Sequence, residues 1–71
     1  MRKKILIEGM SCSHCVKHVE EALREIGGVT SVKVDLKSKN AIVDLAHEIE
    51  DEKFRTVIDD AGYEVTGIEI L

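Results

Sequence analysis

The sequence predicts an α+β domain in which one four-stranded antiparallel sheet carries two helices on one face. Three observations lead to this prediction. Four short stretches read as β-strands, of which the second alternates apolar and polar residues cleanly, and two longer stretches repeat apolar residues every three or four positions. The six stretches follow the order βαββαβ, which is typical of a ferredoxin-like sandwich. We expect strands over 3–8, 30–36, 41–45 and 64–70, and helices over 13–26 and 51–61.

The first strand places Ile5 and Ile7 on one face of the sheet and Leu6 on the other. Gly9 interrupts this alternation and gives the following loop a flexible start. We therefore expect Ile5 and Ile7 to face the core.

The first helix has apolar residues spaced three, four and three positions apart, so they form a single stripe. Charged residues occupy the opposite face, where Glu20 and Arg24 are spaced for an ion pair one turn apart. Gly27 and Gly28 end the helix, because a left-handed residue after the last turn favours glycine. The predicted stripe consists of Val16, Val19, Leu23 and Ile26.

The second and third strands form a hairpin around a polar turn at 37–40. The second strand alternates cleanly, which indicates one buried face. The third strand is predicted to turn Asp44 outward. The residues expected to face inward are Thr30, Val32, Val34 and Leu36 in the second strand and Ala41, Val43 and Leu45 in the third.

The second helix begins in an acidic segment at 50–52, where the helix dipole favours negative charge. Gly62 ends this helix. In the last strand Val65 and Ile68 are out of phase with each other, so Gly67 is predicted to mark a β-bulge. The apolar stripe of the second helix consists of Phe54, Val57, Ile58 and Ala61.

Size and charge narrow the possible functions. With 71 residues, the chain is predicted to be one domain, 1–71. Its net charge of −4 disfavours nucleic acid as a partner. Residues 1–40 hold eight Lys/Arg and five Asp/Glu, whereas residues 41–71 hold two Lys/Arg and nine Asp/Glu. The acidic charge of residues 41–71 either steers the docking of a basic partner or simply belongs to a solvated helix. No segment suits a signal peptide or membrane insertion, and we expect a cytoplasmic protein with reduced thiols.

The two cysteines of the chain, Cys12 and Cys15, lie in the loop that joins the first strand to the first helix. Two thiols at this spacing can bind a soft metal ion or cycle between dithiol and disulfide. Cys15 is expected in the first helical turn, where the helix dipole favours a thiolate and lowers a thiol pKa. Two thiolates and one Cu(I) ion carry a net charge of −1, which suits this position.

Two other chemistries remain open at this loop. A Zn(II) site prefers four ligands, and His18 with Cys12 and Cys15 is a conceivable set. The alternative for His14 and His18 is simple exposure on the helix surface, and His47 is expected at the surface as well. A C-x-x-C segment at a helix start is also the thioredoxin signature, but this chain contains no proline and no tryptophan and its predicted topology differs.

The segment from Gly9 to Cys15 closely resembles the G-M-[ST]-C-x-x-C loop of heavy-metal-associated domains. Gly28-Val29 and Ala61-Gly62-Tyr63, which follow the two helices, are also similar to that family, so the resemblance covers nearly the whole chain. Within the family, the chain resembles the free-standing bacterial copper chaperones of the CopZ type. This resemblance implies a cytoplasmic Cu(I) carrier that is not an enzyme, with Cys12 and Cys15 as metal ligands.

The resemblance also implies partners and roles. The expected recipient is the N-terminal metal-binding domain of a copper-transporting P-type ATPase, a copper-responsive repressor is an alternative recipient, and copper can link two copies into a homodimer. Ser11 stands where family members that prefer Zn(II) often carry Asp, which favours Cu(I). Tyr63 is expected beside the metal, where it either shields the thiolates or simply packs in its loop. Met10 is expected to point inward and support the loop from below.

Three alternatives stay open at this point. The chain can be a Zn(II)- or Hg(II)-binding module, since periplasmic mercury-binding proteins share the loop, although they carry an export signal that this chain lacks. It can be a thiol oxidoreductase. It can also be a detached N-terminal domain of a metal-transporting ATPase, because fold and loop would be the same.

Overall fold

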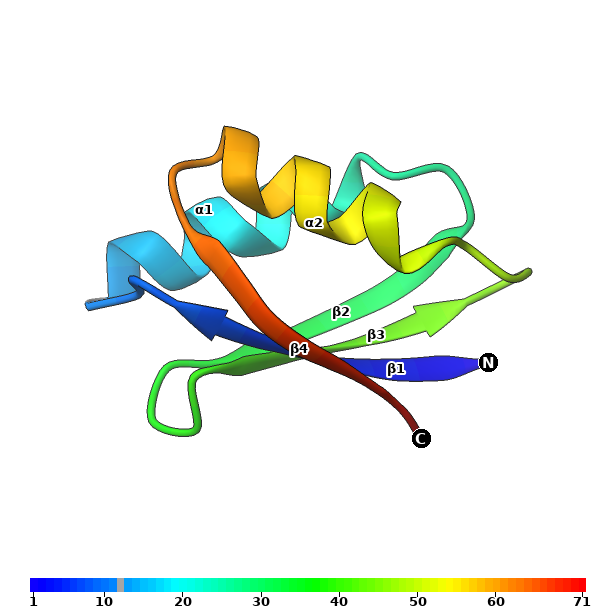
Figure 1. The fold of residues 1–71 in the computed structure, drawn as a ribbon, viewed down its shortest axis with the longest axis horizontal. Coiled ribbons are helices and arrows are strands. Elements are labelled where there is room, and N and C mark those ends of the chain that lie inside the picture. The colour runs from blue at the N-terminus through cyan, green and yellow to red at the C-terminus, as the bar shows by residue number, and fades with distance from the viewer. Residues whose placement is uncertain (12) are drawn as a thin grey trace.

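The computed structural model describes residues 1–11 and 13–71 and confirms the predicted βαββαβ order. The sheet has the strand order β2-β3-β1-β4, and every neighbouring pair is antiparallel. Both helices lie on the same face of this sheet, as Figure 1 shows. The elements are β1 (Arg2–Glu8), α1 (Ser13–Arg24), β2 (Val29–Asp35), β3 (Asn40–Leu45), α2 (Asp51–Asp60) and β4 (Glu64–Ile70).

The core lies between the helices and the sheet, where the predicted apolar stripes meet. The two central strands contribute Ile5, Ile7, Ala41 and Val43, each at most 1% exposed. Buried side chains of both helices cover them, because the stripes with a spacing of three and four face the sheet. The helix residues with no exposed surface are Val19, Leu23, Phe54 and Ile58.

Strand β2 departs from the predicted alternation at its start. The pairing of β2 with β3 shifts between Val29 and Ser31, so Thr30 is an extra residue in the ladder. The prediction that Thr30 faces the core is therefore wrong: the residue is exposed, and its hydroxyl donates a hydrogen bond to the Asp44 carbonyl at 3.1 Å. After this extra residue, Val32 is buried in the core, and Val29 before it is partly buried against the core.

Helix α1 ends at Arg24, two residues before the predicted end, although Ile26 is buried as expected. Of the two glycines that follow, only Gly28 has a positive φ, at 101°. Strand β4 contains the predicted irregularity, because its pairing with β1 shifts between Leu6 and Ile7, opposite Gly67 and Val65. Within the described residues, neither helix is long and apolar enough to cross a membrane.

The connections gather at two ends of the molecule (Figure 1). We call the end formed by residues 9–11 and 61–63 the loop end, since it contains the approach to α1 and the connection from α2 to β4. The opposite end is formed by residues 25–28 and 46–50, which connect α1 to β2 and β3 to α2. The cysteine loop therefore lies far along the molecule from the start of α2.

Candidate metal-binding site

The turn that leads into the cysteine loop depends on a glycine. Gly9 follows β1 with a φ of +101°, a conformation that L side chains rarely adopt. A Cβ atom at this position would lie 3.4 Å from Cδ1 of Tyr63, so the turn packs directly against that ring. The next residue, Met10, is 7% exposed and belongs to the core. The expectation that Met10 points inward is thus confirmed.

Cys15 lies in the first turn of α1 and packs against the core while remaining partly exposed. This turn contains no acidic residue, so the positive end of the helix dipole is not opposed by a carboxylate of that turn. The predicted second ligand, Cys12, lies outside the described residues. The structure therefore places one of the two predicted ligands at a helix N-terminus, as the sequence indicated.

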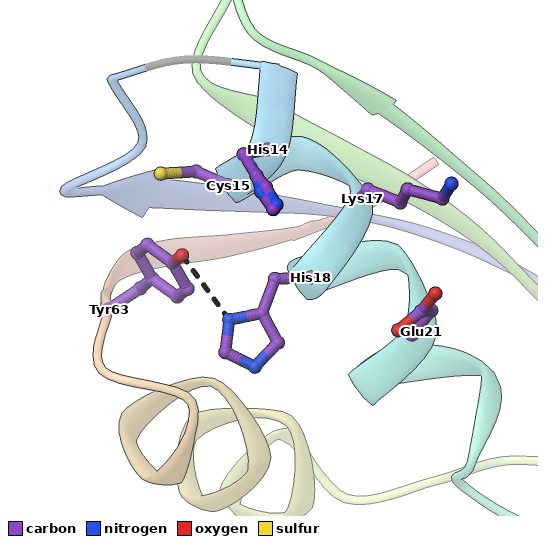
Figure 2. Close-up of a pocket in the computed structure, with 6 residues that line it drawn as sticks. All are labelled: His14, Cys15, Lys17, His18, Glu21 and Tyr63. Carbon is purple, nitrogen blue, oxygen red and sulfur yellow. Dashed lines mark hydrogen bonds between the residues drawn. The ribbon is translucent and has the colours of Figure 1, made fainter.

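An open depression of about 510 Å³ borders Cys15 (Figure 2). Tyr63 forms one wall and comes from the connection between α2 and β4, where its backbone N–H donates to the Ile58 carbonyl at 3.1 Å. Tyr63 was expected near the cysteine loop, and the structure confirms that it lies beside Cys15. The residues around the depression are His14, Cys15, Lys17, His18, Glu21 and Tyr63.

His18 points from α1 toward Tyr63, as the dashed line in Figure 2 marks. The phenol oxygen of Tyr63 and Nδ1 of His18 are 3.5 Å apart. Their rings meet edge to face, with centroids 5.9 Å apart and an interplanar angle of 77°. No sequence pattern predicts this contact, since the two residues are 45 positions apart.

The three histidines occupy different surroundings, and each is exposed as expected. His14 lines the same depression as Cys15, whereas His47 lies at the opposite end, with Nδ1 3.1 Å from the Glu48 carbonyl oxygen. Within residues 1–11 and 13–71, no group of three or more His, Cys, Asp or Glu side chains is arranged to hold a metal ion. The conceivable zinc set of Cys12, Cys15 and His18 includes a residue outside this part of the chain.

A second groove lies on the other side of Tyr63 and is acidic. Its volume is about 380 Å³, and its charged lining residues are Glu8, Asp59 and Glu64. These carboxylates come from the end of β1, the last turn of α2 and the start of β4. The negative charge of the second part of the sequence thus reaches the edge of the cysteine loop.

Comparison with known proteins agrees with this arrangement. Residues 4–64 match the heavy-metal-associated domain family. The chain is 42% identical over 66 residues to the copper chaperone CopZ of Staphylococcus haemolyticus, covering 92% of this chain and 97% of that protein. It is 37% identical over 59 residues to Copper-transporting ATPase 1 of Rhizobium meliloti, covering 83% of this chain and 7% of that protein.

A solved structure of a CopZ metallochaperone superposes with a TM-score of 0.86 at 36% sequence identity. The superposition covers 93% of this chain and 100% of the other. Fold and sequence therefore agree over nearly the full length. The chain belongs to the heavy-metal-associated domain family and, within it, resembles the CopZ type.

Proposed function

We propose that this chain is a cytoplasmic Cu(I) metallochaperone that binds the ion through Cys12 and Cys15. The observation that carries the proposal is the position of Cys15, partly exposed in the first turn of α1 beside an open depression. A thiolate there lies at the positive end of a helix dipole and remains accessible to another protein. The similarity to CopZ copper chaperones supports copper as the cargo.

Transfer would proceed by exchange of soft thiolate ligands. Cu(I) bound to two thiolates has low coordination, so a thiolate of a recipient can add as a third ligand. One of the original Cu–S bonds then breaks, a second thiolate of the recipient binds the ion, and the remaining original Cu–S bond breaks. Each step replaces one Cu–S bond with another, no electron is transferred and no free ion is released.

The proposed recipient is the N-terminal metal-binding domain of a copper-transporting P-type ATPase. The similarity to Copper-transporting ATPase 1 supports this choice, because the match covers only 7% of that protein and so corresponds to one part of a larger chain. The carboxylates of Glu8, Asp59 and Glu64 would attract a recipient with Lys or Arg residues near its own cysteines. A copper-responsive repressor as recipient and a copper-linked homodimer stay predictions, and light scattering with and without Cu(I) would test the dimer.

Anaerobic competition titration with a Cu(I) chelator tests the proposal on Cys12→Ser and Cys15→Ser. We expect each variant to lose more affinity than the roughly 10–100-fold that follows loss of a residue supporting a metal ligand. Ala46→Ser is the control, because it introduces a serine at an exposed site at the opposite end. X-ray absorption of the loaded protein should show sulfur neighbours. Wild-type affinity in either cysteine variant would rule the proposal out, and an equal loss in His18→Ala would favour the zinc alternative.

A further inference from the structure

Tyr63 is held on two sides by elements that flank the cysteine loop. On one side its ring lies against Gly9, where an added Cβ would be 3.4 Å from Cδ1. On the other side it meets His18 through a hydroxyl–imidazole contact of 3.5 Å and an edge-to-face ring contact. The ring therefore connects the turn before the loop to the helix after it.

His18 is well placed for this contact because of its position on α1. It follows Cys15 by three residues, so both side chains lie on neighbouring parts of the helix surface. When the imidazole carries its proton on Nε2, the phenol hydroxyl donates a hydrogen bond to Nδ1. In Figure 2 this nitrogen faces Tyr63, and the contact closes one side of the depression beside Cys15.

The backbone is held on both sides of Tyr63, because Glu64, the next residue, begins β4 and pairs with Glu8 of β1. Gly62 ends α2 with a φ of +96° and has no atom within 4 Å of where its Cβ would be. The Tyr63 N–H is bonded to the Ile58 carbonyl, so the residue is attached to the end of α2. The Tyr63 side chain packs against the core, and its contacts with Gly9 and His18 contribute to where the ring rests.

We propose that His18 is a positioning residue that holds Tyr63 as a wall beside the metal-binding thiolate of Cys15. This inference rests on the proposed function, since it concerns access to copper bound at Cys15. The wall covers one flank of the site and slows the approach of competing ligands from that side. His18 acts through Tyr63 and is not itself a copper ligand.

The chain offers a direct probe of this contact. Tyr63 is the only tyrosine, and the chain has no tryptophan, so intrinsic tyrosine fluorescence reports on this one ring. In the metal-free protein, His18→Ala should change the emission intensity and lifetime of Tyr63, because the imidazole contact is lost. His47→Ala is the matched control, since it removes an exposed histidine at the opposite end and should leave the emission unchanged.

The second measurement is the rate at which bathocuproine disulfonate removes Cu(I) from the loaded protein. We expect His18→Ala to lose copper about fivefold faster, the factor that corresponds to one lost side-chain hydrogen bond. Tyr63→Leu should show a similar increase. In the Tyr63→Leu background, His18→Ala should add less than about a twofold change, because the residue through which it acts is gone.

Several results would overturn the proposal. These are unchanged tyrosine emission in His18→Ala, an equal rate increase in His47→Ala, or a full additional increase from His18→Ala in the Tyr63→Leu background. A nitrogen neighbour in the X-ray absorption of wild-type protein that disappears in His18→Ala would make His18 a ligand instead. The fluorescence of metal-free protein does not depend on copper binding, so failure of the chaperone function and failure of this contact give different outcomes.

Discussion

The two ends of the molecule are held together in different ways. At the opposite end Lys3 is only 4% exposed, and its Nζ donates hydrogen bonds to the Ile49 carbonyl and to Asp51 Oδ1, both at 2.9 Å. The same ammonium group lies 5.8 Å from the centre of the Phe54 ring. At the loop end, the contact between His18 and Tyr63 is longer, at 3.5 Å, and lies near solvent.

This difference indicates that the opposite end stabilises the fold, whereas the loop end is suited to the exchange of a metal ion. Charge-assisted hydrogen bonds in a buried setting fix the start of α2 on β1, so local opening there should cost nearly as much as global unfolding. A site that passes an ion to another protein needs accessible ligands and a surrounding that can adjust. The loop end meets that need, because Cys15 is partly exposed and the contact between His18 and Tyr63 is open to solvent, so local opening should cost less.

The largest effect that we expect at the opposite end comes from Lys3→Met. The substitution keeps most of the apolar stem but leaves the carbonyl of Ile49, itself 8% exposed, without its ammonium partner. We expect the free energy of unfolding to fall by about 3 kcal/mol, as for loss of hydrogen bonds to a charged group. Urea denaturation measures this change.

The control for Lys3→Met is Lys53→Met on the exposed surface of α2, which should change stability little. Copper affinity per folded molecule should stay at the wild-type level in Lys3→Met. A large fall in that affinity would show that the two ends are coupled and would break the separation proposed above.

Two glycines with similar backbone angles give a smaller, paired comparison. Gly28 at the opposite end and Gly62 at the loop end have φ values of +101° and +96°. A Cβ at Gly28 would lie 2.6 Å from Nε2 of His47, whereas a Cβ at Gly62 would meet no atom within 4 Å. Both alanine variants should lose about 1–2 kcal/mol from the left-handed conformation, with a further loss for Gly28→Ala from crowding.

Urea denaturation of both variants, alone and combined with His47→Ala, measures this crowding. Removal of the imidazole should bring Gly28→Ala closer to Gly62→Ala. If the gap between the two variants is unchanged without the imidazole, the tight contact of Gly28 with His47 does not contribute to the packing of this end.

The smallest expected effect concerns an exposed ion pair and its pH dependence. Arg2 Nε donates to Asp44 Oδ1 at 2.8 Å, and this hydrogen bond lowers the pKa of the Asp44 carboxyl from its ordinary value of 3.8. The stabilisation is therefore present above the ordinary pKa and is lost as the pH falls through the lowered pKa of the folded protein. Arg2→Gln should lower Tm by at most a few degrees at pH 7.

Thermal unfolding of wild type and Arg2→Gln at pH 7 and at pH 2 checks this prediction. The difference in Tm should shrink at the lower pH, because the carboxyl is then protonated in both proteins. A difference of the same size at both values would mean that Arg2 stabilises the fold by packing of its stem rather than by its charge.

The sequence predicted the fold well where periodicity alone decides the outcome. The stripes that include Leu23 and Phe54 are buried, and the out-of-phase residues around Gly67 mark a real irregularity in β4. The inward position of Thr30 was wrong because a register shift between two strands depends on both partners. Local alternation within one strand cannot reveal it.

The candidate site was predictable in part. The spacing of Cys12 and Cys15 and the glycine before them identified the loop, and the structure places Cys15 in the first helical turn. The contact of His18 with Tyr63 and the acidic groove beside it could not be predicted. The first depends on how the connection from α2 to β4 lies against α1, and the second on how α2 and β4 lie against the end of β1. Tertiary packing sets both, rather than nearby sequence.

The irregular pairing of β4 has a consequence for how copies of this chain meet. β4 is an outer strand, and such strands offer unpaired N–H and C=O groups to other chains. The shift opposite Leu6 and Ile7 interrupts its regular hydrogen-bonding edge, while Ile70 farther along remains 77% exposed. The edge of β4 therefore does not offer a second molecule a continuous row of backbone groups. Edge-to-edge pairing of two sheets is disfavoured, even though the apolar side chain of Ile70 is exposed to solvent.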